Sequence, residues 1–316
     1  MMLLYNFIKN TTKMFIQIWK KHLSIFLKVC ILVWLFISSE NIFSQTLYLV
    51  YTANLNCNLE SCHCDDKDLG GMLRLFSAVD SLKKKYPDLI LIDTGDFFNS
   101  YPLPEANALM CELMNEMEYD AIGIGDQEFV EGLDFLLKQF KQFSLPLLNG
   151  NIYERKRNRP LFRPYSILNR DGLKILLFGV TSPQSFEFIE APGIQLQLVK
   201  NSIQKILEEV VEKIDLTILL YHAGYNEAKK IAEVFPEIQI IVAGHTQEKF
   251  SLNLEKQIIV QPGFDGEYIG FLEINISEEG LKFNNSFIPI HSGFRENEKF
   301  RKKVNDYYKM MRNIEN

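Results

Sequence analysis

Hydrophobic and polar positions follow two patterns along this chain, one typical of strands and the other of helices. Apolar residues spaced by three or four predict helices, as in the run that carries Leu73, Phe76, Val79 and Leu82. Short apolar runs lie between the helical stretches and predict strands at 46–53, 88–93, 119–124, 145–148, 216–221 and 238–243. Strands that alternate with helices in this way indicate an α/β fold.

The later part of the chain adds strands in a different pattern. Residues 162–168 and 173–180 predict a hairpin around Asn169-Arg170-Asp171-Gly172, a strong turn signal. Three further strands, near 257–261, 268–276 and 281–290, are expected to be antiparallel. Helices are predicted at 104–117, 131–143, 200–213, 226–235 and 296–312. We therefore expect mixed sheets with helices outside, in one domain without an interdomain linker.

The first 45 residues differ from the rest of the chain. They contain five Lys, no Arg and one acidic residue, and they include an apolar segment from Val29 to Ser38. This segment has the length of a signal-peptide core and is short for a bilayer span. Small polar residues after it offer a cleavage site near Ser44. We expect residues 1–45 to be a signal peptide or an uncleaved N-terminal anchor, the only route to a membrane, with 46–292 and the C-terminal helix 293–316 exported to the periplasm or cell envelope.

Charge and cysteine content narrow the functional classes. Without residues 1–45, the chain has 29 basic residues (34 − 5) and 39 acidic residues (40 − 1), a net charge of about −10. No basic stripe remains that could follow a phosphate backbone, which argues against binding of duplex nucleic acid. Four cysteines remain, and three of them, Cys57, Cys62 and Cys64, lie within eight residues. This is a local cluster and not a disulfide framework that cross-links the whole fold.

Polar side chains follow the ends of several predicted strands. Because strand ends converge at one edge of a layered α/β fold, side chains from distant segments can meet there. Carboxylate and amide oxygens and imidazole nitrogens are all ligands for divalent cations. The residues at these positions are Asn54, Asp96, Asp126, Asn151, His222, His245 and Gln247.

Five motifs in order resemble the calcineurin-like metallophosphatase superfamily, specifically the catalytic domain of bacterial periplasmic 5'-nucleotidases. The resemblance runs from about Leu47 to Phe271 and implies a layered α/β/β/α fold. The motifs are Thr52-Ala53-Asn54-Leu55-Asn56, Asp93-Thr94-Gly95-Asp96, Gly125-Asp126-Gln127-Glu128-Phe129, Leu220-Tyr221-His222-Ala223-Gly224 and Gly244-His245-Thr246-Gln247.

The resemblance implies a metal centre. In that family two divalent metals share one Asp and activate a water that attacks phosphorus. Asp96 matches the shared ligand, and Asp126, His222 and His245 match the rest of the second metal's set. Two carboxylates and two imidazoles suit Zn, Mn or Fe better than Ca. We expect one divalent metal at this site.

The first metal's site departs from the family pattern. Asn54 and Asn56 stand where the family has Asp and His, so two ligands lose their usual chemistry, whereas Gln247 matches a position at which some 5'-nucleotidases use Gln. Asn54, Gln247 and Asp96 remain as candidate ligands of the first metal, and only Asp96 among them is charged, so we expect this site to be impaired.

The nearby loop with Cys57, Cys62, His63 and Cys64 leaves three alternatives. The thiols could be soft-metal ligands or a redox site, Cys57 could form a disulfide with Cys62 or with Cys64, or the thiols could be inert.

The catalytic pair of the family is also altered. Gln127 occupies the position of the family's His, and Val130 that of the Asp which orients it. A Gln side chain can hydrogen-bond a phosphoryl oxygen but has no proton to give at neutral pH. We therefore expect weak hydrolysis of a phosphate-ester small molecule, with a nucleotide as one candidate.

Two readings of the function follow. The first is an exported metal-dependent phosphoesterase. The alternative is a catalytically impaired protein that acts as a metal-binding, redox or interaction module of the cell envelope. Full 5'-nucleotidases carry a second domain that stacks the nucleobase, and we expect none in this chain.

Overall fold

The computed structural model describes residues 13–15, 19–26, 28, 44–61 and 68–314. The chain divides into two compact units, Met1–Ser44 and Gln45–Asn316. In the first unit the described residues up to Lys28 are helical and exposed, and Ser44 begins strand β1 (Ser44–Thr52). The apolar segment predicted to be the core of a signal peptide lies outside the described residues. Of the helices within the described ranges, none has both the length and the apolar character needed to cross a bilayer.

The second unit contains two large sheets and a small one. The five-stranded sheet has the order β14-β13-β1-β2-β3, with β1 (Ser44–Thr52), β2 (Ile90–Asp93), β3 (Ala121–Ile122), β13 (Tyr268–Ser277) and β14 (Gly280–Pro289). The six-stranded sheet has the order β11-β12-β10-β9-β7-β6, with β6 (Tyr165–Arg170), β7 (Leu173–Thr181), β9 (Leu216–His222), β10 (Ile240–Ala243), β11 (Lys249–Asn253) and β12 (Ile258–Pro262). The small sheet joins β5 (Arg159–Pro160), β4 (Ile152–Glu154) and β8 (Ile194–Leu196).

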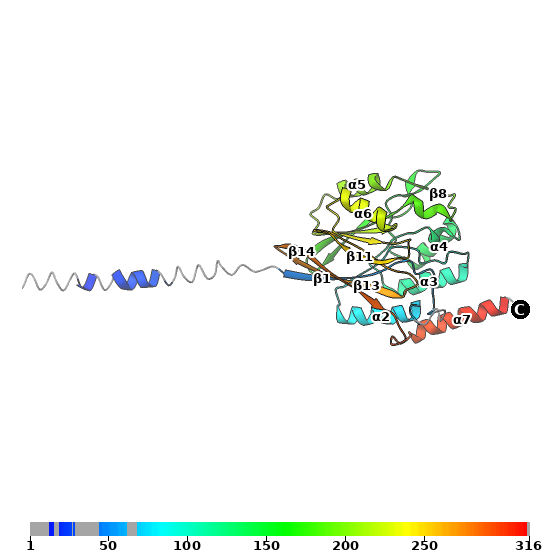
Figure 1. Ribbon diagram of the computed structural model, residues 1–316, viewed down its shortest axis with the longest axis horizontal. Coiled ribbons are helices and arrows are strands. Elements are labelled where there is room, and N and C mark those ends of the chain that lie inside the picture. Colours follow the sequence, from blue (N-terminus) through cyan, green and yellow to red (C-terminus); the bar gives the residue numbers. More distant parts are fainter. Residues whose placement is uncertain (1–12, 16–18, 27, 29–43, 62–67, 315–316) are drawn as a thin grey trace, which may run out of the picture. The chain divides into compact units, whose positions relative to one another are not determined.

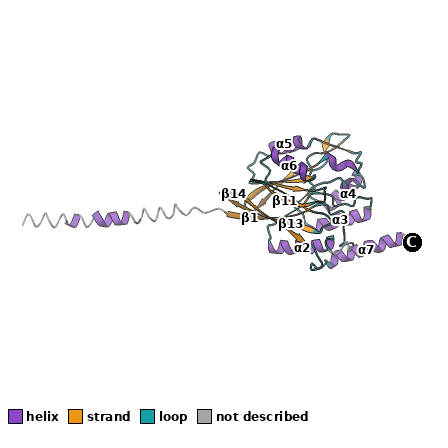
Figure 2. Cartoon of the chain, in the orientation of Figure 1, coloured by secondary structure: helices purple, strands orange, loops and turns teal. Residues whose placement is uncertain are grey.

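Side-chain alternation along the strands creates three apolar layers. In β1, Leu47, Leu49 and Tyr51 point into the layer between the two large sheets, while Val50 points into the opposite layer. That opposite layer is covered by α2 (Met72–Lys85), α3 (Pro104–Met117), α4 (Leu133–Phe143) and α7 (Glu298–Ile314). The six-stranded sheet is covered by α5 (Val199–Glu209) and α6 (Tyr225–Val234). Figures 1 and 2 show helices on both outer faces, which confirms the α/β/β/α arrangement.

Elements with strong local signals form as predicted. Helix α3 begins at Pro104, a residue favoured in the first turn because its missing N–H is not needed there. The predicted hairpin forms between β6 and β7, and its two turn residues, Asp171 and Gly172, have φ of 49° and 80°. Positive φ at both central positions is typical of a type I′ turn, whose twist matches that of the flanking strands.

Two predictions about strands were wrong, and two further features were not predicted. Residues 145–148 form only two isolated bridges, because Pro146 has no N–H to donate to a ladder. Strand β12 was expected to be antiparallel, but it runs parallel to β10 and is antiparallel only to β11. The edge strand β11 and the small sheet were not predicted, since β11 is a polar edge strand and the strands of the small sheet are very short.

Candidate metal centre

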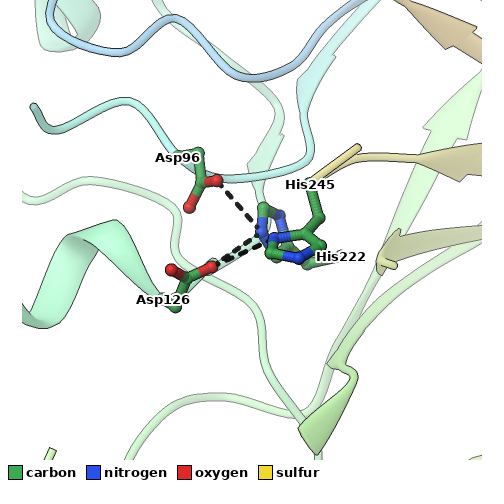
Figure 3. A group of neighbouring side chains, drawn as sticks. All are labelled: Asp96, Asp126, His222 and His245. Atoms are coloured by element: carbon green, nitrogen blue, oxygen red, sulfur yellow. Dashed lines mark ion pairs between the residues drawn. The ribbon is translucent and has the colours of Figure 1, made fainter. Parts of the chain in front are cut away.

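Four side chains from four separate loops gather at the carboxyl ends of strands in the two large sheets. Asp96 follows β2, Asp126 follows β3, His222 ends β9 and His245 follows β10. One ligand atom from each lies within 4.8 Å of the others (Figure 3). The Nε2 atom of His222 is 3.3 Å from Asp96 Oδ2 and 3.4 Å from Asp126 Oδ1, and His245 Nδ1 is 3.3 Å from the same Asp126 oxygen. The sequence grouped these four residues correctly.

The backbone around this cluster lets the ligand side chains approach one another closely. Asp96 and His245 have left-handed backbones, with φ of 58° and 67°, a conformation that is costly outside glycine. Gly125 has no side chain, and a Cβ there would lie 2.1 Å from Asp96 Oδ1 and 2.7 Å from His222 Nε2. Any larger residue at position 125 would push the acid and the imidazole apart.

The cluster contains two polar atoms that nothing in the described chain satisfies. Asp126 Oδ1 and His222 Nε2 are both buried and have no hydrogen-bond partner among the residues that the structure describes. The other ring nitrogen of His222, Nδ1, lies 2.9 Å from the carbonyl oxygen of Thr94. If Nδ1 carries the proton that this carbonyl accepts, Nε2 keeps its lone pair for a metal. The donor set and its two unsatisfied atoms therefore fit a divalent cation.

Electrostatics also favours a cation between these residues. Burial alone would raise the pKa of Asp126, but the neighbouring His222 and His245 imidazoles lower it to about 2. Burial alone would lower the pKa of His222, but the Asp96 and Asp126 carboxylates hold it well above its usual value. Both shifts have the same cause, the attraction between the carboxylates and the protonated imidazoles.

Glu128 organises the loops that carry the ligands, a role that sequence reasoning missed. Its carboxylate is fully buried and accepts four backbone N–H groups, from Gly125 at 2.6 Å, Phe97 at 2.8 Å, Asp96 at 3.1 Å and Phe98 at 3.2 Å. It therefore ties the loop after β2 to the loop after β3. The sequence offers little signal for this role, because three of the four donors lie about thirty residues earlier in the chain.

The side chains of Asn54 and Asn151 hydrogen-bond to the backbone of distant segments and hold these segments in place. Asn54 Oδ1 accepts the backbone N–H of His245 at 2.8 Å, and its amide donates to the Gly263 carbonyl at 3.0 Å. Asn151 makes a similar pair of bonds with the backbone of Thr181. Asn54 thus holds the His245 loop in place, and its role as a metal ligand stays a prediction.

The other candidate ligands do not join the Asp-His cluster in the described part of the chain. Gln247 is exposed, with a left-handed backbone. Cys57 is buried with a free thiol, so this structure does not contain the disulfide considered for it. Cys62, His63 and Cys64 lie outside the described residues, and the proposals that involve them stay predictions.

Cys57 and Cys111 are expected to resist alkylation in the native protein. Both thiols are buried, and burial raises the pKa of Cys57 to about 12 and that of Cys111 well above its usual value. Since the thiolate is the reactive species, neither is available near pH 8. Iodoacetamide treatment followed by peptide mass spectrometry should find both residues unmodified in buffer and modified in urea. Labelling of Cys57 in the native protein would contradict its buried position.

Comparisons with known proteins give relatives and structural neighbours, while no family model matches the chain. The chain is 26% identical to a 5'-nucleotidase of Rattus norvegicus, over 84% of this chain and 52% of the relative, and 32% identical to a 5'-nucleotidase of Vibrio cholerae, over 51% and 32%. It thus spans about half the length of the curated relatives it matches most fully.

Two solved structures share the fold. A 5'-nucleotidase precursor from Thermus thermophilus superposes with a TM-score of 0.75 at 22% identity, covering 84% of this chain and 59% of that one. A calcineurin-like phosphoesterase from Bacillus subtilis superposes with a TM-score of 0.71 at 20% identity, covering 84% of this chain and 97% of that one. The second match shows that the fold described above corresponds to nearly the whole of that structure.

Proposed function

We propose that the chain belongs to the calcineurin-like metallophosphatase superfamily and that it is an exported, metal-dependent phosphoesterase of the 5'-nucleotidase-like group, a proposal that its fold and its sequence relatives support. The proposed substrate is a small phosphate ester, with a nucleotide as one candidate. The proposed cofactor is one divalent ion of Zn, Mn or Fe, bound by Asp96, Asp126, His222 and His245.

The observation that carries this proposal is the pair of unsatisfied buried atoms. Asp126 Oδ1 and His222 Nε2 face each other at 3.4 Å, yet neither has a hydrogen-bond partner in the described chain. Leaving buried polar groups unpaired costs about 1–3 kcal/mol each, so such a pair is unfavourable unless a proton or a cation lies between them. A divalent cation would satisfy both atoms at once.

The residues of the cluster and those around it would have different roles in the reaction. A bound cation would polarise the phosphate ester and lower the pKa of an attacking water. Thr94 orients the His222 ring through its carbonyl, and Glu128 fixes the backbone of Asp96. The side chain of His245 is about one-third exposed, so the cluster can be reached from solvent on that side.

The proton-transfer group of the family is missing, which predicts slow turnover. Gln127 stands in its place, and the side-chain amide cannot protonate a leaving oxygen. Loss of a positioned acid typically lowers the rate by about 10²–10⁴-fold, so activated esters with good leaving groups should be better substrates than nucleoside monophosphates.

The names of structural neighbours bear on export and on the substrate class. The structural neighbour from Thermus thermophilus is a 5'-nucleotidase precursor, and another neighbour is an NAD nucleotidase of Haemophilus influenzae. These names support a phosphate-ester substrate and are consistent with the leader predicted at residues 1–45. The non-hydrolytic alternative is not favoured, since the curated relatives carry the names of nucleotidases.

Hydrolysis of p-nitrophenyl phosphate tests this function. The purified full chain should turn over the ester with added Mn or Zn and stop when EDTA is present. His245→Ala should reduce the rate at least tenfold, because it removes one of four predicted ligands. His291→Ala is the matched control, since His291 is exposed and lies outside the cluster, and it should leave the rate unchanged. Turnover that is absent, or that survives His245→Ala, would refute the phosphoesterase.

A further inference from the structure

A chain of side-chain hydrogen bonds runs beside the metal-ligand cluster. Asn56 Nδ2 donates to Asp265 Oδ1 at 2.7 Å, and Asn56 Oδ1 accepts from Gln127 Nε2 at 3.1 Å. Gln127 Nε2 also donates to Asp96 Oδ2 at 3.3 Å, and the Gln127 backbone N–H donates to the other Asp96 oxygen at 3.2 Å. Asp265 and Asp96 are thus linked through two amides.

The two carboxylates fix the orientation of both amides. An ionised carboxylate only accepts hydrogen bonds, so Asn56 must turn its NH₂ group toward Asp265 and its oxygen toward Gln127. Gln127 must then turn its own NH₂ group toward Asn56 and Asp96, which uses both of its hydrogens. The remaining oxygen, Gln127 Oε1, is buried without a partner in the described chain. The opposite orientation of the Gln127 amide would point Oε1 at two acceptor oxygens, Asn56 Oδ1 and Asp96 Oδ2.

These bonds occupy the atoms that a first metal ion would need. The resemblance assigns that metal to Asp96 together with the positions of Asn54, Asn56 and Gln247, of which Gln247 is exposed. The Asn54 oxygen already accepts the His245 N–H, and the Asn56 oxygen already accepts from Gln127. The shared oxygen of Asp96 receives the Gln127 amide on one side and lies 3.3 Å from His222 Nε2 on the other. The residues present therefore do not fit a first metal.

We propose that the side-chain amide of Gln127 takes the place of the family's first metal ion, so that this centre binds a single divalent cation. The NH₂ group supplies partial positive charge to Asp96 Oδ2, where a second ion would otherwise sit. This inference rests on the proposed function only in its assumption that the Asp-His cluster binds a metal.

The charge of the cluster agrees with one ion. Asp96 and Asp126 contribute two negative charges, which balance one divalent cation when both imidazoles are neutral. A second cation would bring two more positive charges to a region where Asn54 and Asn56 offer none in return. The carboxylate at Asp126, where the family has Asn, is the ligand that makes the single-ion site neutral.

Manganese binding to the full chain tests this inference without an activity assay. After equilibrium dialysis, we expect about one Mn²⁺ per chain and the six-line electron paramagnetic resonance spectrum of an isolated ion. Gln127→Glu keeps the shape of the side chain but replaces the NH₂ donor with a carboxylate facing Asp96. This variant should bind a second Mn²⁺, with a spectrum broadened by coupling between two ions. Gln127→Ala is the matched control: it frees the same oxygens without adding a carboxylate, so it should bind a second Mn²⁺ more weakly than Gln127→Glu does.

The outcomes separate this inference from the function on which it rests. Two coupled ions in the unaltered protein would overturn the single-cation inference and leave the phosphoesterase proposal standing. A Gln127→Glu variant that stays folded but binds only one ion would also overturn it. No bound ion in the unaltered protein would overturn both. Should Gln127→Glu unfold without metal, recovery of its circular dichroism spectrum on adding Mn²⁺ would support the inference, and no recovery would count against it.

Discussion

Glu128→Ala should lower the free energy of unfolding by about 4 kcal/mol or more, the largest effect that we expect from a single substitution here. Removing this buried carboxylate leaves four backbone N–H groups without an acceptor, and each unsatisfied buried donor costs about 1–3 kcal/mol. Water entering the cavity would recover part of that cost. The loops after β2 and β3 would also lose their shared anchor, so metal binding should weaken together with stability.

Glu128→Gln gives a graded version of the same experiment. It keeps the side chain's shape but turns one acceptor oxygen into an NH₂ donor that faces N–H groups. Two of the four bonds are lost in either orientation of the amide, because each oxygen of Glu128 accepts two of them. The loss of stability should therefore be clear but smaller than for Glu128→Ala.

Urea unfolding followed by far-ultraviolet circular dichroism is the suitable measurement. Both tryptophans of the chain lie at positions 19 and 34, so tryptophan fluorescence would not report on the second unit. Glu237→Ala is the matched control, since Glu237 is exposed, and it should change stability by less than about 0.5 kcal/mol. Equal effects of Glu128→Ala and Glu237→Ala would show that the carboxylate does not tie the two loops together.

Local signals in the sequence predicted much of the fold. Helix α3 and the hairpin at Asp171-Gly172 follow from residues within a few positions, so their chemistry is visible in a short window. The edge strand β11 was missed although Phe250 and Leu252 alternate with polar residues along it, because this alternation covers only five residues and the pairing with β12 decides the structure. Register and direction between strands depend on distant partners, which a single sequence does not reveal.

The same distinction separates the ligands from the residues that support them. Asp96, Asp126, His222 and His245 were predicted because each follows a recognisable strand within a family-like motif. The amide link from Asn56 to Asp265 joins residues 209 positions apart, and the sequence gives no sign of it. The sequence therefore predicted which atoms gather at the site. It did not predict that the side-chain amides of Asn56 and Gln127 would hydrogen-bond to each other, or that the Asn54 amide would bond to the backbone of His245 and Gly263.

The apparent affinity for a divalent cation should rise with pH, by up to about tenfold per unit while the pH lies below the raised pKa of His222. Burial lowers that pKa, but Asp96 and Asp126 outweigh the effect and hold it well above its usual value, so metal-free His222 keeps its proton more firmly than a free imidazole does. The proton and the metal compete for the same lone pair on Nε2, which lies 3.3 Å from Asp96 Oδ2 and 3.4 Å from Asp126 Oδ1. Binding of the metal must therefore release a proton, and a lower proton concentration favours it.

Isothermal titration calorimetry in two buffers with different ionisation enthalpies measures this release directly. The difference in apparent binding enthalpy between the buffers, divided by the difference in their ionisation enthalpies, gives the number of protons released. We expect about one proton per metal bound at pH 7. Asp126→Asn is the matched variant: it keeps an oxygen ligand but removes one of the two charges that hold the pKa of His222 up. The region of steep pH dependence should then end at a lower pH, and affinity at pH 8 should fall because the site loses a carboxylate. A flat affinity from pH 6 to 8 in the unaltered protein would mean that His222 is already neutral, and the two carboxylates would then not control the charge of this site.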